Sequence, residues 1–115
     1  MSSDCIFCRI AAGQAEADIL YRDDHITAFW DKRPAAPLHI LIIPNNHIAS
    51  VNELEPADTE VLGRLMLCAK QLAAEAGFAE RGYRLVVNVG YEGGQTVYHL
   101  HMHLIAGKRL PLVHE

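Results

Sequence analysis

Three histidines alternate with aliphatic residues near the end of this 115-residue chain, at positions 99, 101 and 103. Alternate side chains of an extended strand share a face, so the imidazoles of His99, His101 and His103 should line one face. Neighbouring imidazoles would then stand about 7 Å apart along the strand. Each buried polar ring needs a hydrogen-bond partner, so packing alone explains this pattern poorly.

Two chemistries fit such a cluster. One is a multi-histidine metal site, and the other is a site where one histidine acts as nucleophile or base while others hold an anion. The residues just upstream favour the second, because Gly94, Gln95 and Thr96 offer backbone N–H, amide and hydroxyl donors to an oxyanion. Asn88 adds another neutral donor, whereas a metal site would want carboxylates or thiolates there.

Cys5 and Cys8 form a C-x-x-C pair. A redox pair of this kind would usually open a helix in a thioredoxin-like fold, and no such strand–helix–strand pattern is present. As half of a zinc site, the pair would need two more ligands. The third cysteine, Cys68, lies in a helical pattern and is expected to be a small core residue.

The elements that must position these residues follow from hydrophobic periodicity and turn residues. We expect a short helix over 6–12, ended by Gly13, and a long helix over 56–76, ended by Gly77. The predicted strands cover 19–22, 25–30, 39–43, 83–89 and 97–105. Five antiparallel strands with one long and one short helix make an α+β fold, expected as a single domain over 1–115.

Composition excludes several classes of protein. The chain is 50% apolar and 21% charged, which is ordinary for a globular protein and unlike a disordered one. A net charge of −4 argues against a general nucleic-acid binder. No apolar run approaches the length of a membrane span, and the first residues do not form a secretory signal, so we expect a cytoplasmic protein with no membrane partner.

The chain closely resembles the histidine triad (HIT) superfamily, whose motif, His-φ-His-φ-His-φ-φ, matches 99–105 without a gap. The likeness extends through 4–8, 28–31, 34–44, 82–88 and 93–98, in family order. The short length and the tyrosine before the motif are most similar to the Hint branch, the histidine triad nucleotide-binding proteins. This resemblance implies a HIT-like fold whose sheet joins that of a second copy in a homodimer.

The resemblance also implies that the chain binds a purine nucleoside monophosphate and hydrolyses a P–N or related bond on its α-phosphate. His101 would be the nucleophile, forming a nucleotidyl-imidazole that water cleaves to release AMP. The second catalytic residue is His103. Contacts to the α-phosphate or leaving group are expected from Asn88, Gly94, Gln95, Thr96 and His103. Asp31 would hold the ribose hydroxyls, and the base pocket or its support would come from Ile6, Phe7, Phe29 and His39.

The same resemblance suggests a zinc ion on Cys5, Cys8, His47 and His99. Two thiolates and two imidazoles suit tetrahedral zinc, and a closed site with four protein ligands is structural. Catalysis by His101 would then require no cofactor.

The leaving group is open at this point, since Thr96 stands where the Hint branch often has Ser and the tail over 107–115 has no Trp. A diadenosine polyphosphate hydrolase with the same nucleophile is one alternative. A nucleotide-binding regulatory or scaffold protein and a zinc-dependent hydrolase are two others. Arg81, Arg84, Lys108 and Arg109 are expected as surface charges, with Lys108 or Arg109 within reach of a leaving group.

Overall fold

The computed structural model describes residues 4–112, which form two α-helices, two short 3-10 turns and five strands. The order is α1 (Ile6–Ala11), β1 (Ile19–Arg22), β2 (Ile26–Trp30), β3 (Leu38–Pro44), η1 (Val51–Glu53), η2 (Pro56–Asp58), α2 (Thr59–Glu75), β4 (Arg84–Val86) and β5 (Met102–Ala106). The strands make one antiparallel sheet in the order β1-β2-β3-β5-β4. This confirms the predicted α+β fold.

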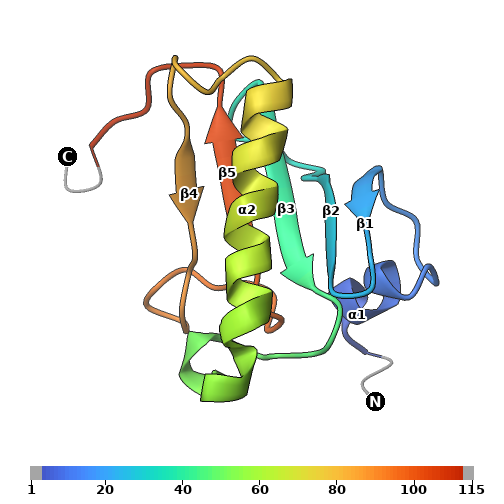
Figure 1. Ribbon diagram of the computed structural model, residues 1–115. Coiled ribbons are helices and arrows are strands. Elements are labelled where there is room, and N and C mark those ends of the chain that lie inside the picture. The colour runs from blue at the N-terminus through green and yellow to red at the C-terminus, as the bar shows by residue number, and fades with distance from the viewer. Residues whose placement is uncertain (1–3, 113–115) are drawn as a thin grey trace.

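The central strand β3 is buried on both faces, which explains its continuous apolar sequence. Ile40 and Ile42 point to the face that α2 covers, where they meet Leu65 and other residues of the main core. Leu41 and Ile43 point to the opposite face, where α1 supplies Phe7 and Ile10. Figure 1 shows α2 running along one face of the sheet, in front of β3 and β5. The other face is therefore left to α1 and the histidines.

The long helix is shorter than the predicted range of 56–76. Pro56 begins a 3-10 turn, and the regular helix α2 starts only at Thr59. Leu65, Ala69 and Ala73 recur every four residues and are its buried stripe. Gly77, at φ +87°, follows the end of the helix in the left-handed region that favours glycine. No helix in the described part of the chain is long and apolar enough to cross a membrane.

The last two strands are also shorter than predicted, and this is the main correction to the expected fold. β4 covers only 84–86 of the expected 83–89, and β5 covers 102–106 where 97–105 was expected. Upstream of β5 the backbone bonds to a loop instead of a neighbouring strand, since the Leu100 N–H donates to the Ile48 carbonyl. The segment containing His99 and His101 thus lies outside the sheet ladder, and the chain bends over 97–99. Of the tail over 107–115, residues 113–115 lie outside the described chain.

Candidate active site

The three histidines share one face, as their alternation predicts, although only His103 belongs to β5. Leu100, Met102 and Leu104 are all buried in the main core beneath α2. His99 and His101 are buried and His103 is half-buried on the opposite side. The ring centres of His101 and His103 lie 5.1 Å apart with their planes at 64°, closer than the spacing along an ideal strand.

The hydrogen bond at His101 determines which of its nitrogens is free. Its Nδ1 lies 2.7 Å from the carbonyl oxygen of His99. A carbonyl can only accept, so Nδ1 carries the proton and Nε2 keeps a lone pair in the neutral ring. The edge of Phe7 packs against this ring at 5.1 Å and fixes its plane. His101 is thereby arranged as a nucleophile through Nε2.

A chain of hydrogen bonds sets the opposite tautomer at His103. The backbone N–H of Ala35 donates to Nδ1 of His39 at 2.9 Å, so the proton of His39 sits on Nε2. That Nε2–H donates to Nδ1 of His103, also at 2.9 Å. Nε2 of His103 must therefore carry its own proton. The result is a neutral donor beside His101 that can bind a phosphate oxygen.

Electrostatics keep His103 neutral. Burial lowers its pKa to about 4, helped by the neighbouring His101 and His39, while the carboxylate of Asp31 acts in the opposite direction. Asp31 approaches Nε2 of His39 to 3.4 Å. Asp31, His39 and His103 also bring ligand-type atoms within 4.8 Å of one another. A metal ion there would require Nε2 of His39 to lose the proton that the Ala35 bond places on it, so this trio does not suit a metal.

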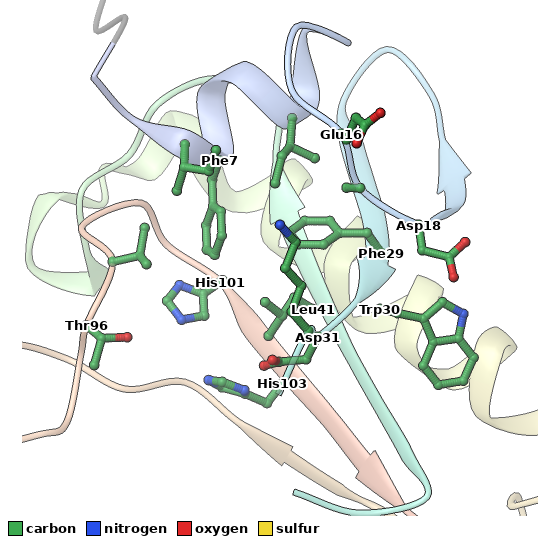
Figure 2. A pocket seen from close by; sticks show the side chains of 15 residues that line it. Phe7, Glu16, Asp18, Phe29, Trp30, Asp31, Leu41, Thr96, His101 and His103 are labelled. Atoms are coloured by element: carbon green, nitrogen blue, oxygen red, sulfur yellow. The ribbon is translucent and has the colours of Figure 1, made fainter. Parts of the chain in front are cut away.

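A cavity of about 520 Å³ opens beside these histidines, within the size range of small-molecule sites. Figure 2 shows Thr96, His101 and His103 at one end of it and Glu16 at the other, with Phe29 and Asp31 between them. Phe7 meets Phe29 edge to face at 5.5 Å. The cavity thus joins polar donors at one end to an apolar section that could take a flat ring. Seven of the expected site residues line it: Ile6, Phe7, Phe29, Asp31, Thr96, His101 and His103.

Four expected site residues do not line the cavity. His39 lies behind it and acts through its bond to His103. The Asn88 amide donates to the Gly93 carbonyl at 2.8 Å. Both ends of the Gln95 amide bond to backbone groups, receiving the Gly90 N–H and donating to the carbonyls of Ala49 and Val97. Asn88 and Gln95 thus bond within the loop before Thr96, in which Gly94 has φ +84°.

Eight lining residues were not anticipated as site residues: Ile10, Glu16, Ala17, Asp18, Trp30, Lys32, Leu41 and Val97. Two of them carried a usable signal. Ile10 lies one helical turn from Ile6, and Leu41 pairs with Phe29 across β2 and β3. The segment over 16–18 and Lys32 show no periodicity that would have marked them.

Two thiols and two imidazoles form a separate cluster. Ligand atoms of Cys5, Cys8, His47 and His99 all lie within 4.8 Å of one another. Nδ1 of His99 is 3.3 Å from the Cys5 sulfur and 3.5 Å from the Cys8 sulfur. The Cys8 sulfur is also 3.2 Å from Nδ1 of His47. A tetrahedral zinc ion with ligands at about 2.0–2.3 Å would separate them by roughly 3.3–3.8 Å. The cluster therefore has the donor types and spacing that zinc requires.

Hydrogen bonds and burial around this cysteine–histidine cluster favour the binding of a cation. Nε2–H of His99 donates to the Pro44 carbonyl at 2.8 Å, which leaves Nδ1 unprotonated and aimed at the thiols. Burial lowers the pKa of His99, so its ring stays neutral as a ligand must. Cys5 begins α1, and its sulfur accepts the backbone N–H of Cys8. Burial, with the neighbouring Cys5, raises the pKa of Cys8 to about 11, so binding a cation would release a proton.

Comparison with known proteins places these features in one family. The family model described as "Scavenger mRNA decapping enzyme C-term binding" matches residues 4–112. A purine nucleoside phosphoramidase of Escherichia coli K12 is 46% identical over 110 residues, which are 96% of this chain and 92% of that protein. The structure of a HIT family hydrolase from Legionella pneumophila superposes with a TM-score of 0.94 at 46% identity, covering 96% of this chain and 98% of that one.

A further solved structure bears on the cysteine–histidine cluster. It is described as a Zn-bound histidine triad family protein from Mycobacterium smegmatis, and it superposes with a TM-score of 0.79 at 28% identity. It covers 91% of this chain and 76% of that one.

Proposed function

The chain belongs to the histidine triad family of hydrolases, and from that premise we propose that it hydrolyses purine nucleoside 5′-phosphoramidates and related nucleotidyl conjugates. The observation that carries the proposal is the tautomer of His101, whose Nδ1–H is bonded to a carbonyl while Nε2 is free beside the cavity. The name of the 46% identical relative from Escherichia coli supports the same substrate class.

The reaction would proceed in two displacements. In the first, the Nε2 lone pair of His101 forms a bond to the α-phosphorus as the P–N bond breaks, and the leaving nitrogen keeps that electron pair and takes up a proton. In the second, water attacks the same phosphorus, the P–Nε2 bond breaks, and the nucleoside monophosphate leaves with the water oxygen. One water is consumed overall, and a proton taken up in the first step is returned in the second.

The other residues would bind the substrate around that phosphorus. Nε2–H of His103 would donate to a phosphate oxygen, and the Thr96 hydroxyl lies at the same end of the cavity. Asp31 would accept hydrogen bonds from the ribose hydroxyls. The purine would occupy the apolar section near Phe7 and Phe29. Asn88, Gly94 and Gln95 would act by holding the loop that carries Thr96.

Zinc would be structural in this scheme. Bound by Cys5, Cys8, His47 and His99, it would join the start of α1 to the segment that precedes the nucleophile. His99 and His101 use different nitrogens and face different partners, so hydrolysis would not require metal at the phosphorus. Ligand thiols must stay reduced, which fits a cytoplasmic location.

We also propose a homodimer formed at β4. This strand ends the sheet and offers an unpaired backbone edge. Val87, just beyond it, is 37% exposed, and Tyr98 is 51% exposed. Pairing with the β4 of a second copy would merge the two sheets and cover that edge. Mass measurement in solution tests this directly, since a monomer at micromolar concentration would contradict it.

Incubation with adenosine 5′-phosphoramidate tests the activity. We expect AMP release by the wild type and none by His101→Ala, with His25→Ala as a control on an exposed histidine. Substrate labelled at the α-phosphorus should leave label on wild-type protein after a rapid quench in alkaline denaturant, because a P–N bond to imidazole survives alkali and is hydrolysed by acid. AMP binding without hydrolysis would reject the proposal and favour a nucleotide-binding regulatory protein.

A further inference from the structure

Four cations converge on a small cavity next to β4. Arg81, Arg84, Lys108 and Arg109 line it, and its volume is about 200 Å³. These are four of the ten Lys and Arg residues in a chain whose net charge is −4. The lining of the cavity contains no Asp or Glu. Within residues 4–112, none of these four cations forms an ion pair with a carboxylate.

Strand pairing brings this cluster to the face of the catalytic histidines. Val86 of β4 pairs with His103, and Arg84 pairs with Ile105, which also pairs with His39 across β3. Paired residues of an antiparallel sheet point to the same face, so Arg84 stands on the side of His39 and His103. It is the diagonal neighbour of His103, a relation that puts their backbones about 7–8 Å apart.

The other cations come from two segments that flank β4 and β5. Arg81 precedes β4, and its guanidinium lies 4.8 Å from the ring centre of Phe78. Lys108 and Arg109 follow β5, where the chain turns across toward the β4 side (Figure 1). Arg84 donates to the Pro111 carbonyl and Arg109 to the Leu110 carbonyl, so both retain further N–H donors. If β4 pairs with the β4 of a second copy through its backbone edge, these side chains would stay on the face of the sheet and keep their positions.

We propose that the group released from the α-phosphorus carries an oxyanion, which Arg84 binds with help from Lys108 and Arg109. This inference rests on the proposed hydrolysis and specifies its leaving group. The cavity runs from Thr96 and His103 toward Glu16, with Phe29 between them. A purine near Phe29 would therefore leave the departing group on the side of His103, where strand pairing places Arg84. A carboxylate or a further phosphate on the leaving group would meet guanidinium donors there, and bidentate pairing suits both anions.

Two matched substrates test the charge alone. One is AMP joined through a P–N bond to β-alanine, which ends in a carboxylate, and the other is AMP joined to β-alanine amide, its neutral isostere. We expect the wild type to show a kcat/KM about tenfold higher for the carboxylate substrate. Arg84→Gln should bring this ratio to about one, whereas Lys70→Gln, on an exposed site of α2, should leave the ratio unchanged.

The double variant Lys108→Gln/Arg109→Gln gives an independent test outside the strands, in case Arg84→Gln perturbs the sheet. It should lower the ratio as well, and added salt should lower it in the wild type. Diadenosine tetraphosphate distinguishes the source of the anion. If Arg84→Gln loses cleavage of diadenosine tetraphosphate, the anion on the leaving group is a polyphosphate. If Arg84→Gln loses only cleavage of the carboxylate substrate, the leaving group is an amino acid.

The outcomes separate this inference from the one it rests on. Equal kcat/KM for the two matched substrates would overturn the anionic leaving group while P–N hydrolysis stands. A preference that persists in both charge variants would overturn the assignment to this cluster. No hydrolysis of either substrate, or of adenosine 5′-phosphoramidate, would instead overturn the proposed function.

Discussion

His99 and His101 are two residues apart on the segment that precedes β5, are both buried, and have opposite environments. His99 donates from Nε2 to the Pro44 carbonyl and turns Nδ1 toward two thiols. His101 donates from Nδ1 to the His99 carbonyl and keeps Nε2 free beside the cavity. The backbone carbonyl that each ring finds decides which nitrogen is basic. One residue type at one spacing thereby serves two different chemistries.

His101, the proposed nucleophile, gives the sharpest contrast between the two regions. His101→Ala should lower kcat on adenosine 5′-phosphoramidate at least about 10³-fold, because no other described side chain presents a free nitrogen at that position. Its melting temperature should stay close to that of the wild type. His47→Ala, at the exposed ligand of the other cluster, should keep measurable turnover below its own melting temperature. Comparable activity losses in both variants would erase the contrast.

Removal of the metal should lower the melting temperature more than it lowers turnover, the reverse of the effect of His101→Ala. Elemental analysis should find one zinc per chain, and Cys8→Ser should abolish it. Losing the metal should lower the melting temperature by about 10 °C, roughly 3 kcal/mol for a domain of this size. Cys68→Ser, at the cysteine outside the cluster, is the matched control and should keep its zinc. A chelator that stops turnover with no change in melting temperature would instead indicate zinc-dependent catalysis.

His39 tests whether the relay behind the cavity matters. His39→Ala removes the donor that holds the proton of His103 on Nε2, and we expect kcat/KM to fall about thirtyfold. His39→Gln places an amide that can still donate, and it should recover part of this loss. The two variants should bind zinc equally, since His39 is remote from that cluster. An unchanged kcat/KM in His39→Ala would show that the hydrogen bond from His39 to His103 does not contribute to hydrolysis.

The weakest expected effect is on stability at low pH. Burial, His101 and His39 lower the pKa of His103 from 6.5 to about 4 against the opposing effect of Asp31. The unfolded chain therefore binds more protons than the folded chain between these values. The stabilisation is complete above pH 6.5 and is lost as pH falls toward 4.

Urea unfolding at pH 7 and pH 5 measures this stabilisation. The wild type should lose about 1–2 kcal/mol more than His103→Gln, which lacks the titrating ring. His25→Gln, at an exposed histidine, should behave like the wild type. A wild type and a His103→Gln variant with the same pH dependence would contradict the burial argument.

Much of the fold was predictable because its signals are local. Alternation assigned the faces of 99–104 correctly, and hydrophobic periodicity with Gly77 located the long helix, although not its exact start. Strand ends were not predictable, since an extended residue shows the same alternation inside or outside a ladder. Leu100 illustrates this, because its N–H bonds to Ile48, a residue 52 positions upstream with no marker in the sequence.

The site residues also divide into those that local sequence signals predict and those that depend on contacts formed only in the folded chain. Phe7, Phe29, Asp31 and Thr96 line the cavity as expected. Gln95 does not, because the partners of its amide are backbone groups that only the folded loop brings together. Arg84 looked like an ordinary surface charge, and only the pairing of β4 with β5 shows that it shares a face with His103.

The most direct test of the central claim is a long-range proton–nitrogen NMR spectrum of histidine-labelled protein loaded with zinc. We predict that His101 carries its proton on Nδ1, that His103 carries it on Nε2, and that His99 is protonated on Nε2 with Nδ1 bound to metal. A spectrum with the His101 proton on Nε2 would remove the free lone pair from the cavity and contradict the account.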